Sequence, residues 1–222
     1  MTASFVSDTH QFQESSSSMT VTVPSGVQDG DVLLAFFVCR DLQPATISGW
    51  TQIWNADRST LDYYAAYYRV ASSEPSSYSW TWADALSVPK ATVNAVALRG
   101  VDSTTLLSGV SNTDTAPSIN APDAGLIVGF WGSYYGGITA YTLDSAMTEI
   151  ELQTNLNSSQ MSCVSGYEAV SAGATGTRTS STGSAGRQHG GLVYFAAAAG
   201  GMLRRHPGMD GMPDTMSGGM LG

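Results

Sequence analysis

Charged residues are scarce in this chain: they make up 12% of its 222 residues, about half the share found in typical soluble domains. The 9 Lys and Arg are outnumbered by 18 Asp and Glu, which gives a formal net charge of −9. Because such a charge is repelled by phosphate groups, we expect no nucleic-acid partner and no membrane partner. A partner must then be recognised through shape, apolar contact or neutral hydrogen bonds.

Long apolar runs and cysteines are also in short supply. No uninterrupted apolar run approaches the roughly 20 residues that a membrane-spanning helix needs. Residues 1–5 show neither the basic nor the apolar region of a secretory leader, so we expect synthesis in the cytoplasm. Cys39 and Cys163 are too few for a disulfide framework, and each lies among apolar or small residues. We therefore predict two buried, reduced thiols.

Helical periodicity is almost absent, whereas strand signals recur along the chain. Residues 19–23 alternate between apolar and polar, and residues 32–39 form a continuous apolar run that follows a turn at 29–31. Further strand candidates lie at residues 50–54, 63–70, 78–82 and 92–98. Closely spaced strands of this kind predict an all-β fold, an antiparallel β-sandwich with a jelly-roll-like layout.

The second half of the chain repeats the strand plan of the first. Residues 32–34, 50–53, 68–71 and 96–98 are echoed by residues 126–128, 147–150, 167–170 and 192–194. Two interpretations remain open: an internal duplication of about 19–102 and 119–195, or the chance likeness of two all-β segments. We expect one sandwich rather than two, because each half offers too few strands to close a good core of its own.

The composition changes after residue 199. Five of the nine Met and seven of the 24 Gly lie in residues 200–222, where two Arg balance two Asp. We therefore divide the chain into a β-sandwich body, 1–199, and an extended Gly/Met-rich tail, 200–222, with no fold of its own. Flexible Met side chains suit irregular apolar grooves on a partner. The residues expected to make these contacts are Met202, Leu203, Met209, Met212, Met216, Met220 and Leu221.

Residues that could carry catalysis are few. The three histidines, His10, His189 and His206, lie in no nucleophile motif and lack zinc-ligand spacing, so we interpret them as surface or loop residues. Glu149 and Glu151 share one strand face by period-two spacing, but a solvated face explains them more simply than glycosidase chemistry. We expect no enzyme activity, no cofactor and no metal.

Aromatic residues are more suggestive, and two interpretations remain open. They form rows that are either packed in the core or exposed, where they would stack on sugar rings or on a neighbouring subunit. The candidates for an exposed aromatic surface are Trp80, Trp82, Trp131, Tyr134 and Tyr135.

Several short motifs give the body a resemblance to a known module. They are Val21-Thr22-Val23-Pro24-Ser25-Gly26-Val27, Gly30-Asp31-Val32-Leu33-Leu34-Ala35, Gly49-Trp50-Thr51, Tyr67-Tyr68-Arg69-Val70-Ala71 with Glu74-Pro75, and Ala95-Val96-Ala97-Leu98-Arg99-Gly100-Val101-Asp102. Together they resemble a β-rich module that recurs in virion proteins of tailed bacteriophages and in some secreted bacterial proteins. Residues 119–195 look like a weaker continuation. The resemblance covers most of the body but not the tail.

The resemblance implies a structural or adhesive role and no catalytic site. We expect a phage virion structural protein of the decoration (cement) or fibre type, located in the virion and attached partly through its tail. Its partners would be the major capsid or tail proteins and further copies of itself in a homo-oligomer. The alternative is a carbohydrate- or host-receptor-binding module of a tail fibre, with a glycan as partner.

Overall fold

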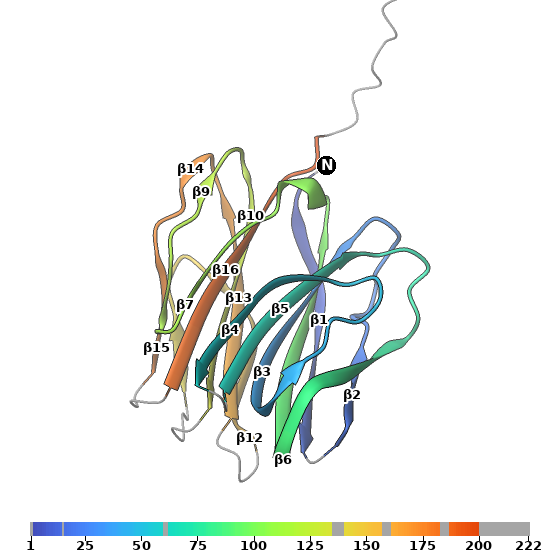
Figure 1. Ribbon diagram of the computed structural model, residues 1–222. Helices are drawn as coiled ribbons and strands as arrows, with labels where there is room; N and C mark the ends of the chain where they lie inside the picture. The colour runs from blue at the N-terminus through green and yellow to red at the C-terminus, as the bar shows by residue number, and fades with distance from the viewer. Residues whose placement is uncertain are drawn as a thin grey trace, which may run out of the picture.

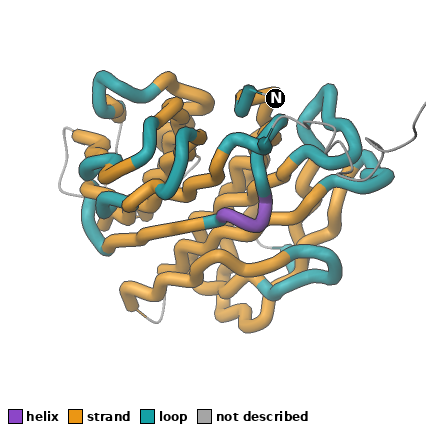
Figure 2. The backbone as a smooth tube through the Cα atoms, turned by 90° about the horizontal axis from the view of Figure 1, so that it is seen from above, coloured by secondary structure: helices purple, strands orange, loops and turns teal. Residues whose placement is uncertain are grey.

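The computed structural model describes residues 2–14, 16–59, 62–134, 140–156, 161–182 and 187–199. Almost all of this chain is strand and loop, with one short 3-10 helix (Figures 1 and 2). The elements are β1 (Ser4–Glu14), β2 (Ser18–Thr22), β3 (Val32–Pro44), β4 (Thr51–Ser59), β5 (Asp62–Val70), β6 (Ser77–Arg99), η1 (Ser103–Thr105), β7 (Leu107–Ser111), β8 (Thr115–Ala116), β9 (Asn120–Ala121), β10 (Gly125–Tyr134), β11 (Tyr141–Leu143), β12 (Thr148–Leu156), β13 (Met161–Val170), β14 (Gly173–Ala174), β15 (Arg178–Thr182) and β16 (Arg187–Ala196). The predicted all-β class is confirmed.

Two large antiparallel sheets dominate the molecule. The first sheet has the order β1-β6-β3-β5-β4, and β2 pairs with the start of β6. The second sheet has the order β12-β13-β10-β16-β7. Two smaller sheets, β11-β15-β8 and β14-β9, complete the second half. Figure 1 shows the two large sheets facing each other, so the predicted antiparallel sandwich is confirmed.

Each large sheet is built from one half of the chain. A jelly roll passes the chain back and forth between its two main sheets, whereas this chain completes the first sheet before it begins the second. The jelly-roll comparison therefore describes only the antiparallel, two-layer character of the fold. The strand order itself follows a different plan.

The two halves share strand order and register. In the first sheet Val32 lies between Val70 and Leu98, and in the second Leu126 lies between Ala169 and Phe195. Strands β3 and β5 match β10 and β13 as the sequence repeat aligned them, but β16 is shifted by one residue relative to β6. The shift has a physical reason. Side chains alternate between the two faces of a strand, so the one-residue shift lets Phe195 face the central core as Leu98 does. Equal topology is what a duplicated strand plan predicts, and the duplication itself stays a prediction.

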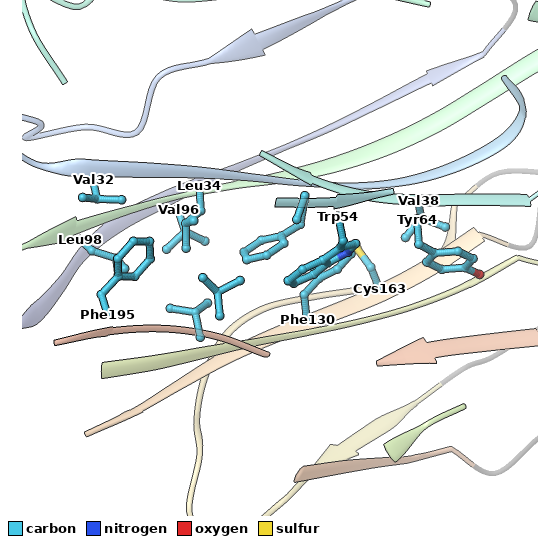
Figure 3. Close-up of a cluster of buried hydrophobic side chains, with 14 of the residues drawn as sticks. Val32, Leu34, Val38, Trp54, Tyr64, Val96, Leu98, Phe130, Cys163 and Phe195 are labelled. Carbon is cyan, nitrogen blue, oxygen red and sulfur yellow. The ribbon is translucent and has the colours of Figure 1, made fainter. Parts of the chain in front are cut away.

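The main core lies between the two large sheets (Figure 3). Phe36 from the first sheet stacks on Phe130 from the second, with ring centroids 4.9 Å apart. The backbones approach closely here: a Cβ on Gly132 would lie 2.2 Å from Cγ2 of Val38, which no packing allows. Glycine at this position lets the sheets meet.

Two further cores cover the outer faces of the large sheets. One lies between the first sheet and the layer formed by β2 and the start of β6, and it includes Phe37, Trp50 and Trp80. The other lies on the outer face of the second sheet and includes Trp131 and Tyr194. The central strands are consequently buried on both faces. Cys39 and Cys163 lie in two different cores as buried free thiols, which confirms the predicted reduced state.

Candidate functional site

The prediction of an exposed aromatic surface is wrong for Trp80, Trp131 and Tyr134. Trp80 and Trp131 are 0% and 1% exposed and Tyr134 is 5% exposed. Trp82 is half-buried against the outer core of the first sheet, and Tyr135 lies outside the described residues. Among described residues, the large hydrophobic side chains that are exposed are all aliphatic, namely Val70, Leu107 and Leu152.

The reason for this error is the number of layers. A two-layer sandwich would bury one aromatic row and expose the other, whereas here outer layers cover the second face of each large sheet. The indole N–H groups of these two buried tryptophans have backbone partners: Trp80 Nε1 donates to the carbonyl of Ala45 at 2.8 Å, and Trp131 Nε1 to that of Asp114 at 2.9 Å. The tryptophans therefore tie the outer layers to the large sheets and present no platform for a sugar ring.

The predicted tail contacts, Met202, Leu203, Met209, Met212, Met216, Met220 and Leu221, all lie outside the described residues. The residues immediately before the tail are described, and backbone hydrogen bonds hold them to the body. The amide of Asp102 donates to the carbonyl of Ala196 at 2.9 Å, and the amide of Ala198 donates to that of Gly100 at 2.8 Å. The amide of Ala197 donates to Ala124 at 3.0 Å. We call residues 196–198 the tail root; it is bonded to the ends of both halves.

A shallow pocket of about 210 Å³ lies beside the tail root. Its lining includes Asp31 and Arg99, which form a bidentate ion pair: Nε donates to Oδ1 at 2.9 Å and Nη2 to Oδ2 at 2.7 Å. Arg99 also donates to the carbonyl of Gly26, and the amide of Gln28 donates to Asp31. The turn at residues 26–31 is therefore fixed against the end of β6, as expected for the turn predicted at residues 29–31.

A second ion pair fixes the neighbouring turn after β5. Arg69 Nη2 lies 2.9 Å from Oε1 of Glu74, and its guanidinium lies over the ring of Tyr78 at 5.0 Å. The hydroxyl of Tyr78 donates to Glu74 in turn. Burial raises the pKa of Tyr78, and its hydrogen bond with the Glu74 carboxylate raises it further. Trp50 packs edge-on against the Tyr78 ring, so the turns before β4 and β6 are joined as well.

These contacts connect several of the motifs that carry the phage-module resemblance. Gly26, Asp31 and Arg99 come from three separate motifs and meet in one hydrogen-bonded cluster. They meet beside the tail root, since Ala198 lines the same pocket as Asp31 and Arg99. The sequence pattern identified the turns, but no signal in it paired Asp31 with Arg99, which lies 68 residues away.

A different polar cluster lies where edge strands β1 and β12 meet, one from each half. Asp8 on β1 and Glu151 on β12 face each other here, since Asp8 pairs with Val96 of the central core and Glu151 pairs with Ser165. Asn94 donates to Oδ2 of Asp8 at 3.2 Å and accepts from Ser165 at 2.8 Å. We call these four residues, Asp8, Asn94, Glu151 and Ser165, the inter-half polar cluster.

This arrangement corrects the predicted pairing of Glu149 with Glu151. A β-bulge between them changes the register, so that Glu149 pairs with Gly166 and Glu151 with Ser165. The extra residue puts the two carboxyl groups on opposite faces of the strand. Glu149 is exposed, while Glu151 points inward to Asp8.

Of the two histidines in the described chain, His189 is a buried strand residue, which corrects the prediction of a surface or loop residue. His189 on β16 is 2% exposed and stacks on Tyr64 with ring centroids 3.4 Å apart. His10 is half-buried on β1, with Nε2 2.6 Å from the hydroxyl of Thr92, and burial lowers its pKa to about 4. His206 lies outside the described residues. No cluster of three or more His, Cys, Asp or Glu in the described part of the chain could hold a metal ion.

Comparison with known proteins gives no relative. No family model, no curated protein and no solved structure matches this chain. In the part of the chain that the structure describes, no helix is long and apolar enough to cross a membrane. The function must therefore be argued from the residues and their geometry.

Proposed function

We propose that this chain is a virion structural protein of a tailed bacteriophage, of the decoration (cement) or fibre type. In this proposal the β-sandwich is a rigid body, and residues 200–222 attach it to neighbouring virion subunits. Its partners are the major capsid or tail proteins, and several copies assemble together. The sequence resemblance motivates the class of protein, and the tail root supports the mode of attachment.

The observation that carries this proposal is the anchoring of the chain immediately before the tail. Three backbone hydrogen bonds hold residues 196–198 against Gly100, Asp102 and Ala124. The residues that carry the resemblance fix the same end of the molecule through the Asp31–Arg99 pair. A neutral Gly/Met segment that leaves a rigid end suits attachment, because any pull on it is passed directly to the body.

Deletion of residues 200–222 tests the attachment. We expect the shortened protein to fold with an unchanged circular dichroism spectrum and melting temperature, and to be lost from purified particles. The matched control keeps the tail length but replaces its five Met and two Leu by Ser. If apolar anchoring is the cause, this control is lost as well. Undiminished incorporation of both variants would show that the tail is not the tether.

The copy number per particle separates the decoration type from the fibre type. Quantitative mass spectrometry of purified virions should show many copies for a shell component, and a few copies for a fibre or vertex component. Absence of the chain from purified virions would overturn the proposal as a whole.

The receptor-binding alternative has no support from exposed aromatic residues, because Trp80, Trp131 and Tyr134 are buried. No other described feature favours glycan binding over assembly.

A further inference from the structure

The inter-half polar cluster is unusual because it joins two acidic groups without a cation between them. Asp8 and Glu151 come from different sheets and different halves of the chain, and the pairing of their strands brings the two carboxyl groups together on either side of Asn94 and Ser165. Two ionised carboxylates repel each other and neither can donate a hydrogen bond, so a hydrogen bond between them requires a proton on one of them.

The surroundings of Asp8 supply no compensating positive charge among the described residues that face it. On β1, His10 lies on the same face as Asp8. Burial lowers the pKa of His10 to about 4, so that His10 is neutral above that pH. From β6 come Asn94 and Thr92, and from β13 come Cys163 and Tyr167. Lys90, farther along β6, is paired with Glu14 at 3.1 Å.

We propose that Asp8 and Glu151 form a proton-dependent clasp between the two halves of the sandwich. When the pair holds a proton, one carboxyl group donates to the other and fastens β1 to β12. When both groups are ionised, they repel each other and this side of the sandwich loosens. The clasp lies at an edge that no large-sheet neighbour covers, because β1 and β12 each have only one strand partner in their large sheet.

The direction of the pH dependence follows from the environment of Asp8. Burial raises its pKa above the ordinary value of 3.8, the charge of Glu151 raises it further, and the hydrogen bond from Asn94 opposes both. The folded protein then holds a proton that the unfolded chain has lost. The stability contributed by the clasp is therefore full below pH 3.8 and is lost as the pH rises through the raised pKa.

The local bulge makes this contact available. Because the bulge between Glu149 and Glu151 shifts the register of β12, Glu151 points toward β1 and Glu149 points away. Glu149 is therefore the matched control: it lies on the same strand, has the same side chain and faces solvent instead of Asp8.

The test uses the full chain and three variants, Asp8→Asn, Glu151→Gln and Glu149→Gln. The first measurement is amide exchange of residues 149–153 between about pH 4 and pH 8, corrected for the intrinsic rate. In the wild type and Glu149→Gln, the local opening constant should rise with pH by about tenfold for each unit by which the pair's pKa is raised. In Asp8→Asn the amide donates to Glu151 at every pH, so the corrected profile should be flat.

The second measurement is the titration of the Asp8 carboxyl carbon by NMR, which needs no stable variant. A shared proton predicts two coupled steps, one of them above the ordinary pKa. In Glu151→Gln, Asp8 should titrate closer to 3.8, and in Glu149→Gln its titration should not change. A single wild-type step at about 3.8, or equal pH profiles of exchange in wild type and Asp8→Asn, overturns the clasp.

Discussion

Phe36 and Phe130 occupy equivalent positions in the two halves of the chain, and they stack on each other at the centre of the sandwich. Each lies in the middle strand of its own large sheet, β3 or β10. The most central contact of the molecule is therefore made between matching residues of two similar units. If the halves descend from one ancestor, this contact is where two copies of it met.

The stack predicts strong coupling between the two rings. Phe36→Ala and Phe130→Ala should each lower the free energy of unfolding by about 3–5 kcal/mol, because both rings are buried and leave a cavity. The double variant should cost less than the sum, since the second truncation removes contacts already lost. Urea unfolding of the four proteins measures this coupling, and strict additivity would argue against direct ring contact.

Gly132 predicts a steric limit on how the sheets approach. In Gly132→Ala the new methyl group would meet Val38, and the sheets would have to separate. We expect a loss of about 1–3 kcal/mol in the free energy of unfolding, the usual cost of overpacking a core. Ser108→Ala, an exposed substitution on β7, serves as the control and should be within about 0.5 kcal/mol of wild type. The double variant Gly132→Ala, Val38→Ala should recover part of the loss.

The Asp31–Arg99 pair predicts unequal effects for two neighbouring acidic residues. Asp31 is 3% exposed and accepts three hydrogen bonds, two from Arg99 and one from the amide of Gln28. Asp31→Asn should lower the melting temperature by several degrees, because the amide cannot accept all three bonds. Asp29 is exposed and accepts one bond, from the amide of Ser73, so Asp29→Asn should have a smaller effect. Equal melting temperatures for the two variants would contradict a structural role for the pair.

We expect His10 to make the protein less stable as the pH falls, whereas the clasp makes it less stable as the pH rises. Burial lowers its pKa from 6.5 to about 4, so the folded state keeps it neutral where the unfolded chain is protonated. Its contribution is full above pH 6.5 and is lost as the pH falls toward 4. In His10→Gln this loss should disappear, and urea unfolding at steps between pH 7 and pH 4 would measure the difference. A His10→Gln profile parallel to that of wild type would assign the acid loss to other groups.

Much of the fold could be predicted because its signals are local. The alternation at residues 19–23 became β2, and the apolar run at 32–39 became the middle of the first sheet. A run that is apolar at every position indicates a strand buried on both faces, and Phe36 and Phe37 indeed lie in two different cores. The same reasoning, applied to the apolar run that contains Trp131, would have placed that residue inside.

The polar contacts could not be predicted, because they depend on which distant strands meet. Asp8 and Glu151 are 143 residues apart, and their contact requires both the packing of β1 against β12 and a bulge that one extra residue creates. Period-two counting assumes a regular strand and therefore failed at Glu149 and Glu151. His189 likewise follows a polar, Gly-rich segment typical of a loop, yet it lies in β16, paired with Gly132 of β10.

The tail root has a mechanical consequence. It continues β16, which is paired along its length with β10 on one side and, at residues 190–194, with β7 on the other. A force applied to residues 200–222 would act along the axis of β16, so that its lateral hydrogen bonds resist together instead of opening one at a time. If residues 200–222 attach the protein to its surroundings, as we propose, this geometry would let the body bear load through β16.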